Sequence, residues 1–471
     1  MITEYVLILL FLLPFILVRK MQGSVTQFFK GRHILNTWYI SLSAVATNHS
    51  AFVYLGQIGF TYIYGLESLW LTVGWKLGDW ISMIALQPRL KKIIKEKNIF
   101  TISELVKSDD QSLHSYTRLI FGCIALLGLI IYSSAQISAV EKMLDFYQVE
   151  NKLFIIISML AVIFYYLNRG GFDASVKTDT PQALIMFISV SMVFYFGLME
   201  LGGFNNAYLE LLKIETETKL IVDPFNLGTP SSVAFFLIGW FFAGAGTIAQ
   251  PHILMRFMAS ENLHALRLVQ IKYILISTLF SLPILGIALI AKVLIPPGSI
   301  TDPELALLVL TQSYLPEYFV LILVMGVISA AMSTLDSLVI ASSTIIVKDT
   351  SPVVRRFVIS PRIATGVVLI AIYIYWVLGN SSVFKTIISS WSLVASIYLP
   401  LILLKLLKID MNQKGILFGA VTSIATLYLW RSLALDTMMY ELLPATIMYF
   451  FVYWCSHFLT SSSRLGKNAD Y

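Results

Sequence analysis

About thirteen apolar segments follow one another along the 471-residue chain, each close to the twenty or so residues that a helix needs to cross a bilayer. Hydrophobic residues make up 57% of the sequence and charged residues only 13%, far from the composition of soluble domains. Because unpaired backbone polar groups are costly in lipid, spanning segments of this length form helices. The sequence therefore predicts an all-α integral membrane protein with about thirteen transmembrane helices.

The predicted spans are not separated by polar linkers, so we expect residues 1–471 to form a single membrane domain. The first span ends in Arg19 and Lys20 and lacks a small-residue cleavage site, so we interpret it as a retained helix. The spans cover residues 2–18, 37–64, 68–86, 116–144, 153–167, 181–201, 231–249, 266–295, 318–347, 363–378, 383–407, 416–430 and 439–458.

Basic residues gather in loops that lie on one side of the membrane when the spans are counted in order. The positive-inside rule then places the N-terminus outside and the C-terminus in the cytoplasm of a multi-pass protein of the inner (plasma) membrane. The net charge of +6 therefore indicates topology, and no nucleic-acid partner is predicted. The residues that decide this orientation are Arg19, Lys20, Lys30, Arg32, Arg89, Lys91, Lys92, Lys95, Lys97, Lys348, Arg355, Arg356, Arg362, Arg464 and Lys467.

Two of the spans contain residues that interrupt a membrane helix. In the second span, four polar side chains from Thr47 to Ser50 follow one another, and the seventh contains Gly244 and Gly246 and is followed by Pro251. Paired interruptions in two halves are typical of transporters built from inverted repeats, with the site at the bilayer midplane. Alternatively, the glycines and hydroxyls serve only tight packing. The predicted units are an extra N-terminal helix and loop (1–36), two five-span repeats (37–203 and 230–408) and C-terminal helices (409–471).

The ninth span contains the run ISAAMSTLDSLVIASST, which combines small and hydroxyl residues. Ala330, Ser333, Thr334 and Ser337 fall three and four residues apart, on one face of a helix. Hydroxyl oxygens in a bundle interior are hard ligands for a dehydrated cation, although such residues also simply pack or bond the preceding turn. Asp336 favours the functional interpretation, because a carboxylate in a membrane helix is costly unless it faces partners or water.

Four stretches together resemble the sodium/solute symporter family, most closely its sodium/proline branch. They are LSAVATNHSA (42–51), GGFDASVKTDTPQA (170–183), QPHILMRFMA (250–259) and AAMSTLDSLVIASS (330–343). The resemblance implies the inverted five-helix repeat of the leucine-transporter type, with a discontinuous first core helix. It also implies a sodium site made by backbone carbonyls and hydroxyls at Ala46, His49, Ala330, Ser333 and Thr334.

A second ion site is a further implication of the resemblance. Some relatives use an aspartate at the position of Asp179, which Ser333, Asp336 and Ser337 would complete. Asp336 departs from the hydroxyl that relatives often have there, and two nearby carboxylates would share a cation or a proton. The alternative for Asp179 is an ordinary helix N-cap ahead of Pro181.

The resemblance places the solute near the two interruptions. The implied substrate-binding residues are Thr47, Asn48, Ser50, Tyr132, Gln136 and Trp240. Two of them weaken the match to proline carriers: Asn48 stands where the proline branch has aspartate, and Trp240 is displaced by about one helical turn.

We therefore predict a sodium-coupled secondary active symporter that imports a small nutrient, proline or a similar amino acid first, by alternating access. Sodium is the only cofactor predicted, and the oligomeric state stays open. One alternative is a sodium- or proton-coupled carrier of a monocarboxylate, sugar or vitamin. A membrane nutrient sensor is an alternative of another class, although no signalling module is recognisable in the sequence. No enzyme is predicted, because Asp179, Asp336 and His49 match no known spacing of nucleophile and base.

Overall fold

The computed structural model of this chain is helical throughout the residues that it describes, and no strand occurs among them. The first predicted span, 2–18, lies almost entirely outside this part of the chain, as do Arg355 and Arg356. The described residues are 14, 16–18, 24–31, 35–106, 111–215, 230–296, 298–349, 359–379, 382–409 and 411–467.

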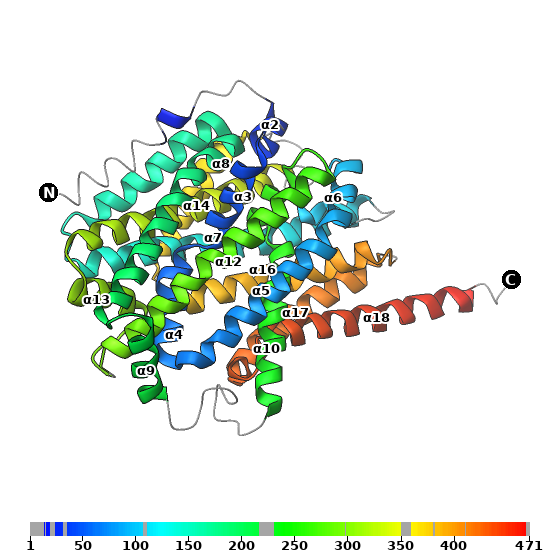
Figure 1. Cartoon of the computed structure of the whole chain (residues 1–471). Coiled ribbons are helices and arrows are strands. Elements are labelled where there is room, and N and C mark those ends of the chain that lie inside the picture. The colour runs from blue at the N-terminus through cyan, green and yellow to red at the C-terminus, as the bar shows by residue number, and fades with distance from the viewer. Residues whose placement is uncertain are drawn as a thin grey trace.

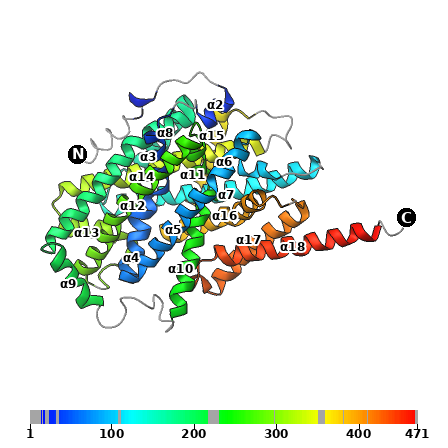
Figure 2. The same ribbon diagram turned by 45° about the vertical axis from the view of Figure 1, so that its right-hand side comes forward.

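The helices form one bundle with α3 near its centre (Figure 1). In chain order the α-helices are α2 (Val25–Lys30), α3 (Thr37–Asn48), α4 (Ile58–Tyr64), α5 (Leu69–Ala85), α6 (Gln87–Glu96), α7 (Gln111–Phe146), α8 (Lys152–Glu200), α9 (Phe204–Glu215), α10 (Pro230–Ala245), α11 (Pro251–Met258), α12 (Leu263–Leu294), α13 (Ala306–Tyr314), α14 (Tyr318–Asp349), α15 (Pro361–Val377), α16 (Val383–Leu406), α17 (Gln413–Ser432) and α18 (Leu442–Lys467). The α17 and α18 helices pack against each other, and α18 projects beyond the rest of the bundle (Figure 2).

Five of the described helices, α7, α8, α12, α14 and α16, are long and apolar enough to cross a membrane. The segments Val233–Ala249 and Pro251–Met258, which contain most of α10 and all of α11 and are bent by 59°, together have the length and composition of one broken span. The 49-residue α8 is kinked at Gly171 (φ 54°), where a Cβ atom would lie 2.5 Å from the carbonyl oxygen of Phe28. Only glycine fits this left-handed, crowded position.

The predicted boundary of the sixth span was wrong. The sequence predicts a helix that begins at Pro181, but Pro181 lies inside α8, beyond the kink at Gly171. A proline within a membrane helix is tolerated when neighbouring groups satisfy the freed backbone carbonyl. The same observation rules out the alternative that Asp179 caps a helix, since Asp179 also lies within α8.

The predicted discontinuity of the first core helix is confirmed. The α3 helix ends at Asn48, and His49 (φ −94°, ψ 69°) leaves the helical conformation. The chain then continues as a π-helical segment, Phe52–Gln57, before α4 begins. Because the backbone bonds of an α-helix stop at the break, carbonyl oxygens near the end of α3 are free for other partners.

The second predicted interruption is also present. A short 3₁₀ segment, Gly246–Ala249, follows α10, and Gln250 is extended (φ −88°, ψ 109°). Pro251 then occupies the first turn of α11, where its missing N–H costs nothing. Both breaks lie in the bundle interior: α3 packs against α8, α11, α12 and α14, and the 3₁₀ segment packs against α16.

Candidate functional site

The end of α3 meets α14 through two hydroxyl side chains. Ser333 Oγ lies 3.2 Å from the carbonyl oxygen of Ala46 and 3.2 Å from that of Ala330. Thr334 Oγ1 lies 3.5 Å from the Ala46 carbonyl and 3.2 Å from that of Thr47. The structure thus brings together four of the five predicted sodium-site residues, with Thr47 as an additional carbonyl. All of these groups are buried, and hydroxyl and carbonyl oxygens are the ligands that a small hard cation prefers.

The side chain of His49 has a structural partner on each ring nitrogen. Lys76 Nζ lies 3.1 Å from Nε2 and also donates to Ser277 Oγ at 2.5 Å. Because a lysine ammonium only donates, Nε2 accepts and Nδ1 donates to the carbonyl of Val45, 3.1 Å away. The ring therefore anchors the end of α3 to α5 and α12. Sequence reasoning missed Lys76, although a lysine within a predicted span was a signal.

The residues predicted to form a second ion site are gathered between α8 and α14. Asp336 accepts hydrogen bonds from Tyr166 (2.7 Å), Ser175 (2.8 Å) and Ser337 (3.1 Å). Asp179 Oδ2 accepts from Ser43 Oγ of α3 at 2.5 Å. The carboxylates of Asp179 and Asp336 are completely buried, so their charge has to be balanced by groups within the protein or by a bound cation.

Arg256, a residue absent from the sequence predictions, contributes a cation to this cluster. Its Nη2 atom donates to Ser175 Oγ at 2.6 Å and to Ser337 Oγ. The same atom lies 3.5 Å from Asp179 Oδ2 and 3.7 Å from Asp336 Oδ1, and all three charged side chains are fully buried. An arginine inside the QPHILMRFMA stretch was a sequence signal, because an intramembrane charge indicates function by default.

Three of the predicted substrate-binding residues lie together at the first break. Tyr132 donates to Ser50 Oγ at 3.4 Å, and Gln136 Oε1 accepts from the backbone N–H of Ala51 at 3.1 Å. The Tyr132 ring lies edge to face with the ring of His252, 5.4 Å between centroids. The polar side chains of the two broken helices and α7 therefore converge on one region.

Several buried polar atoms in this region have no partner among the described residues. They are Gln136 Nε2, Gln250 Oε1 and both ring nitrogens of His252. Buried polar groups in proteins are almost always paired, so an unpaired set indicates a polar ligand or ordered water. Gln250 and His252 were not predicted, although they stand on either side of Pro251 at the interruption.

The structure separates the other predicted substrate-binding residues from this group. Asn48 Nδ2 donates to the hydroxyl of Tyr273, which in turn donates to Asp79 at 2.8 Å. Thr47 Oγ1 lies 2.9 Å from Ser337 Oγ, in the ion cluster. The Trp240 ring stacks on those of Trp75 (5.9 Å) and Tyr440 (4.9 Å).

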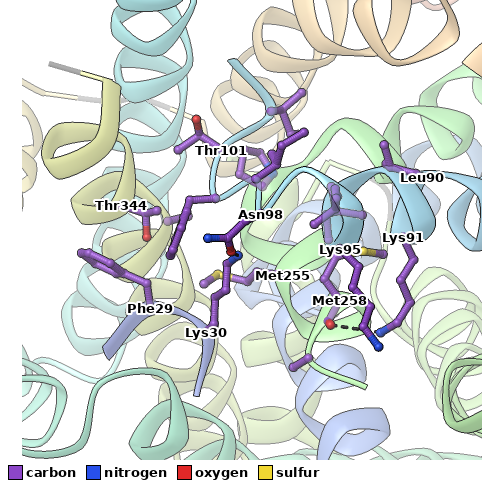
Figure 3. Close-up of a pocket in the computed structure, with 18 of the residues that line it drawn as sticks. Phe29, Lys30, Leu90, Lys91, Lys95, Asn98, Thr101, Met255, Met258 and Thr344 are labelled. Atoms are coloured by element: carbon purple, nitrogen blue, oxygen red, sulfur yellow. Dashed lines mark hydrogen bonds between the residues drawn. The ribbon is translucent and has the colours of Figure 1, made fainter. Parts of the chain in front are cut away.

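A cavity of about 440 Å³ lies between α2, α6, α11 and α14 and reaches Pro251 at the second break (Figure 3). Lys30, Lys91 and Lys95, on which the predicted orientation depends, line it. Lys91 Nζ donates to Ser260 Oγ at 2.7 Å and to the Met258 carbonyl at 3.1 Å, at the C-terminal end of α11. Burial lowers the Lys91 pKa to about 8, so its ammonium stays largely charged at neutral pH.

The family model of the sodium:solute symporter family matches residues 28–423. Sodium/proline symporter 2 of Staphylococcus saprophyticus is 24% identical over 448 residues, which cover 91% of this chain and 85% of the relative. The osmoregulated proline transporter OpuE of Bacillus subtilis is also 24% identical, over 91% of this chain and 88% of the relative.

Solved structures of transporters share the fold. A Na⁺-coupled sialic acid symporter in a substrate-bound, outward-open state superposes with a TM-score of 0.73 at 14% identity, over 96% of both chains. A manganese transporter of Eremococcus coleocola gives a TM-score of 0.52 at 12% identity, over 93% of this chain and 97% of that one. The predicted all-helical membrane fold is confirmed, and with a family model that spans most of its length, the chain belongs to the sodium:solute symporter family.

Proposed function

We propose that this symporter imports a small carboxylate-bearing nutrient, proline first, together with sodium. The proposal is carried by the contact between α3 and α14, where Ser333 and Thr334 lie within 3.5 Å of the carbonyl of Ala46. It is supported by the two relatives described above, both of which are proline carriers. In this transport reaction, sodium would be carried across the membrane together with the solute, and the sodium gradient would drive the uptake.

Sodium binding would join two parts of the bundle. Carbonyls of Ala46 and His49 belong to the broken helix, whereas Ala330, Ser333 and Thr334 belong to the continuous α14. A cation between them would hold the end of α3 against α14 and order the adjacent break. A ligand shifts a conformational equilibrium only by its differential affinity for the two states, so sodium would favour the state in which these carbonyls and hydroxyls meet.

The driving force is sufficient for accumulation of a neutral solute. One sodium ion that moves through about 100 mV supplies roughly 2.3 kcal/mol. A tenfold concentration gradient adds about 1.4 kcal/mol. Together they support accumulation by a few hundredfold, since each 1.4 kcal/mol or so corresponds to a factor of about ten.

The solute would bind where the two breaks meet. Ser50, Tyr132 and Gln136 offer hydroxyl and amide groups on one side, and Gln250 and His252 offer unpaired polar atoms on the other. The α11 helix begins there, and the positive end of a half-helix dipole favours a carboxylate.

One observation favours a second candidate, a carrier of a monocarboxylate. Proline and other amino acids have a charged amine, which a carboxylate at the solute site would neutralise. The hydrogen bonds described for Ser50, Tyr132 and Gln136 involve no carboxylate. Asn48 is neutral, and its side chain is bonded to Tyr273. A monocarboxylate requires no such partner.

Uptake into proteoliposomes separates the two candidates. The purified chain, with an imposed inward sodium gradient, is expected to accumulate labelled proline, and unlabelled proline should compete with it. Acetate, pantothenate and sugars serve as competitors in parallel. Accumulation of labelled acetate but not of proline would replace proline by a monocarboxylate, and uptake that is independent of sodium would contradict the proposed coupling.

The proposed orientation, with α6 in the cytoplasm, has a direct test. Cys123 and Cys455 are exposed and are first replaced by serine, after which Lys97→Cys introduces a single exposed thiol at the end of α6. An impermeant thiol reagent added to intact cells should leave this cysteine unlabelled and should label it in broken cells. Labelling in intact cells would invert the orientation.

A further inference from the structure

We propose that Arg256 is the built-in cation of the predicted second ion site, so that the protein binds one sodium ion per cycle. That ion binds between α3 and α14, and the inference rests on the proposed sodium symport. It differs from the sequence prediction, in which a second sodium ion or a proton would balance Asp179 and Asp336.

The first argument is position. The Nη2 atom of Arg256 contacts hydroxyls of both α8 and α14, Ser175 Oγ at 2.6 Å and Ser337 Oγ. Its distances to the carboxylates, 3.5 Å to Asp179 Oδ2 and 3.7 Å to Asp336 Oδ1, place it between the two. This nitrogen therefore stands among the side-chain oxygens that a second sodium ion would need.

The second argument is that the guanidinium is held in place. Arg256 Nη1 donates to the carbonyl of His252 at 3.1 Å, one turn earlier in α11. The guanidinium carbon also lies 5.2 Å from the centre of the Phe172 ring, an arrangement typical of a cation–π contact. The side chain is completely buried. Moving it away would leave a buried arginine and two buried carboxylates without a partner of opposite charge, which is strongly unfavourable.

The third argument is charge balance. In their ionised forms, Asp179 and Asp336 contribute two negative charges, and Arg256 contributes one positive charge. One monovalent cation at the neighbouring site makes the buried cluster neutral, whereas two would leave it positive.

The second ion site and the sodium site between α3 and α14 are close enough for their charges to compensate each other. Ser337 Oγ lies 2.7 Å from the carbonyl of Ser333 and 2.9 Å from Thr47 Oγ1, and both of these residues also belong to the contact between α3 and α14. Asp336 is therefore the negative charge that favours the single sodium ion, and Arg256 is the partner of Asp179.

Equilibrium binding of radioactive sodium to the purified full chain tests the inference without knowledge of the solute. We expect the wild type to bind one sodium ion per chain, without cooperativity. Arg256→Gln keeps a polar side chain but removes the charge, and it should bind two sodium ions per chain. Arg256→Lys keeps the charge and should bind one, as should Arg169→Gln, which alters an exposed arginine.

The outcomes separate this inference from the proposed function. Two sodium ions bound by the wild type would overturn the inference and leave sodium symport intact, whereas no bound sodium would contradict both. One ion bound by Arg256→Gln with wild-type affinity would also overturn it. If Arg256→Gln does not fold, the variant Asp336→Ser tests the charge argument instead. We expect this variant to bind one sodium ion at least about tenfold more weakly than the wild type does. A sodium affinity equal to that of the wild type would refute the charge argument.

Discussion

Replacing Ser333 and Thr334 together by alanine is expected to raise the sodium concentration for half-maximal uptake by at least about a hundredfold, because each hydroxyl bond to a charged group contributes roughly 1.5–3 kcal/mol. The two hydroxyls contact carbonyls at the end of α3, and alanine has no oxygen that could take their place. Initial rates of solute uptake into proteoliposomes across a series of sodium concentrations measure the effect.

The matched control is Ser342→Ala on the same helix. Ser342 is buried, and its hydroxyl has no hydrogen-bond partner among the described residues, so its loss should leave the sodium dependence unchanged. If the double variant retains the wild-type sodium dependence, Ser333 and Thr334 do not bind the ion. A similar change in Ser342→Ala would show that any small perturbation of α14 has this effect.

Substitution of Gly244 by alanine is expected to prevent stable assembly of the bundle. A Cβ atom at Gly244 would lie 1.9 Å from the carbonyl oxygen of Trp75, and one at Gly78 would lie 1.8 Å from that of Phe241. Both obstacles are backbone atoms, so α5 and α10 would have to move apart. We expect the free energy of unfolding to fall by about 3 kcal/mol or more, which equals or exceeds the upper end of the usual cost of overpacking. The yield of monodisperse protein and its thermal unfolding midpoint measure it.

Gly366 provides the matched control. It also lies within a helix, but a Cβ atom there would meet the Phe164 side chain at 3.4 Å, an ordinary contact. Gly366→Ala should therefore be neutral or slightly stabilising, since alanine favours a helix more than glycine does. A wild-type unfolding midpoint for Gly244→Ala would mean that the crossing of α5 and α10 is less tight than the structure indicates.

Local patterns in the sequence determined much of the architecture. Apolar segment length predicts membrane helices, and runs of polar residues, glycine and proline predict where two of them break. The face formed by Ala330, Ser333 and Thr334 follows from helical periodicity alone, because these side chains are neighbours on one helix. Such features depend only on residues close together in the chain.

Tertiary structure alone decided which groups meet across helices. Asn48 bonds Tyr273 instead of facing Tyr132, and Pro181 continues a helix that Gly171 had already kinked. Arg256 reaches the carboxylates of Asp179 and Asp336 from a different helix. Packing between segments far apart in the chain decides which group pairs with a buried charge, and this pairing lowers the free-energy cost of burying the charge. The spacing of residues within one segment therefore cannot reveal the partner.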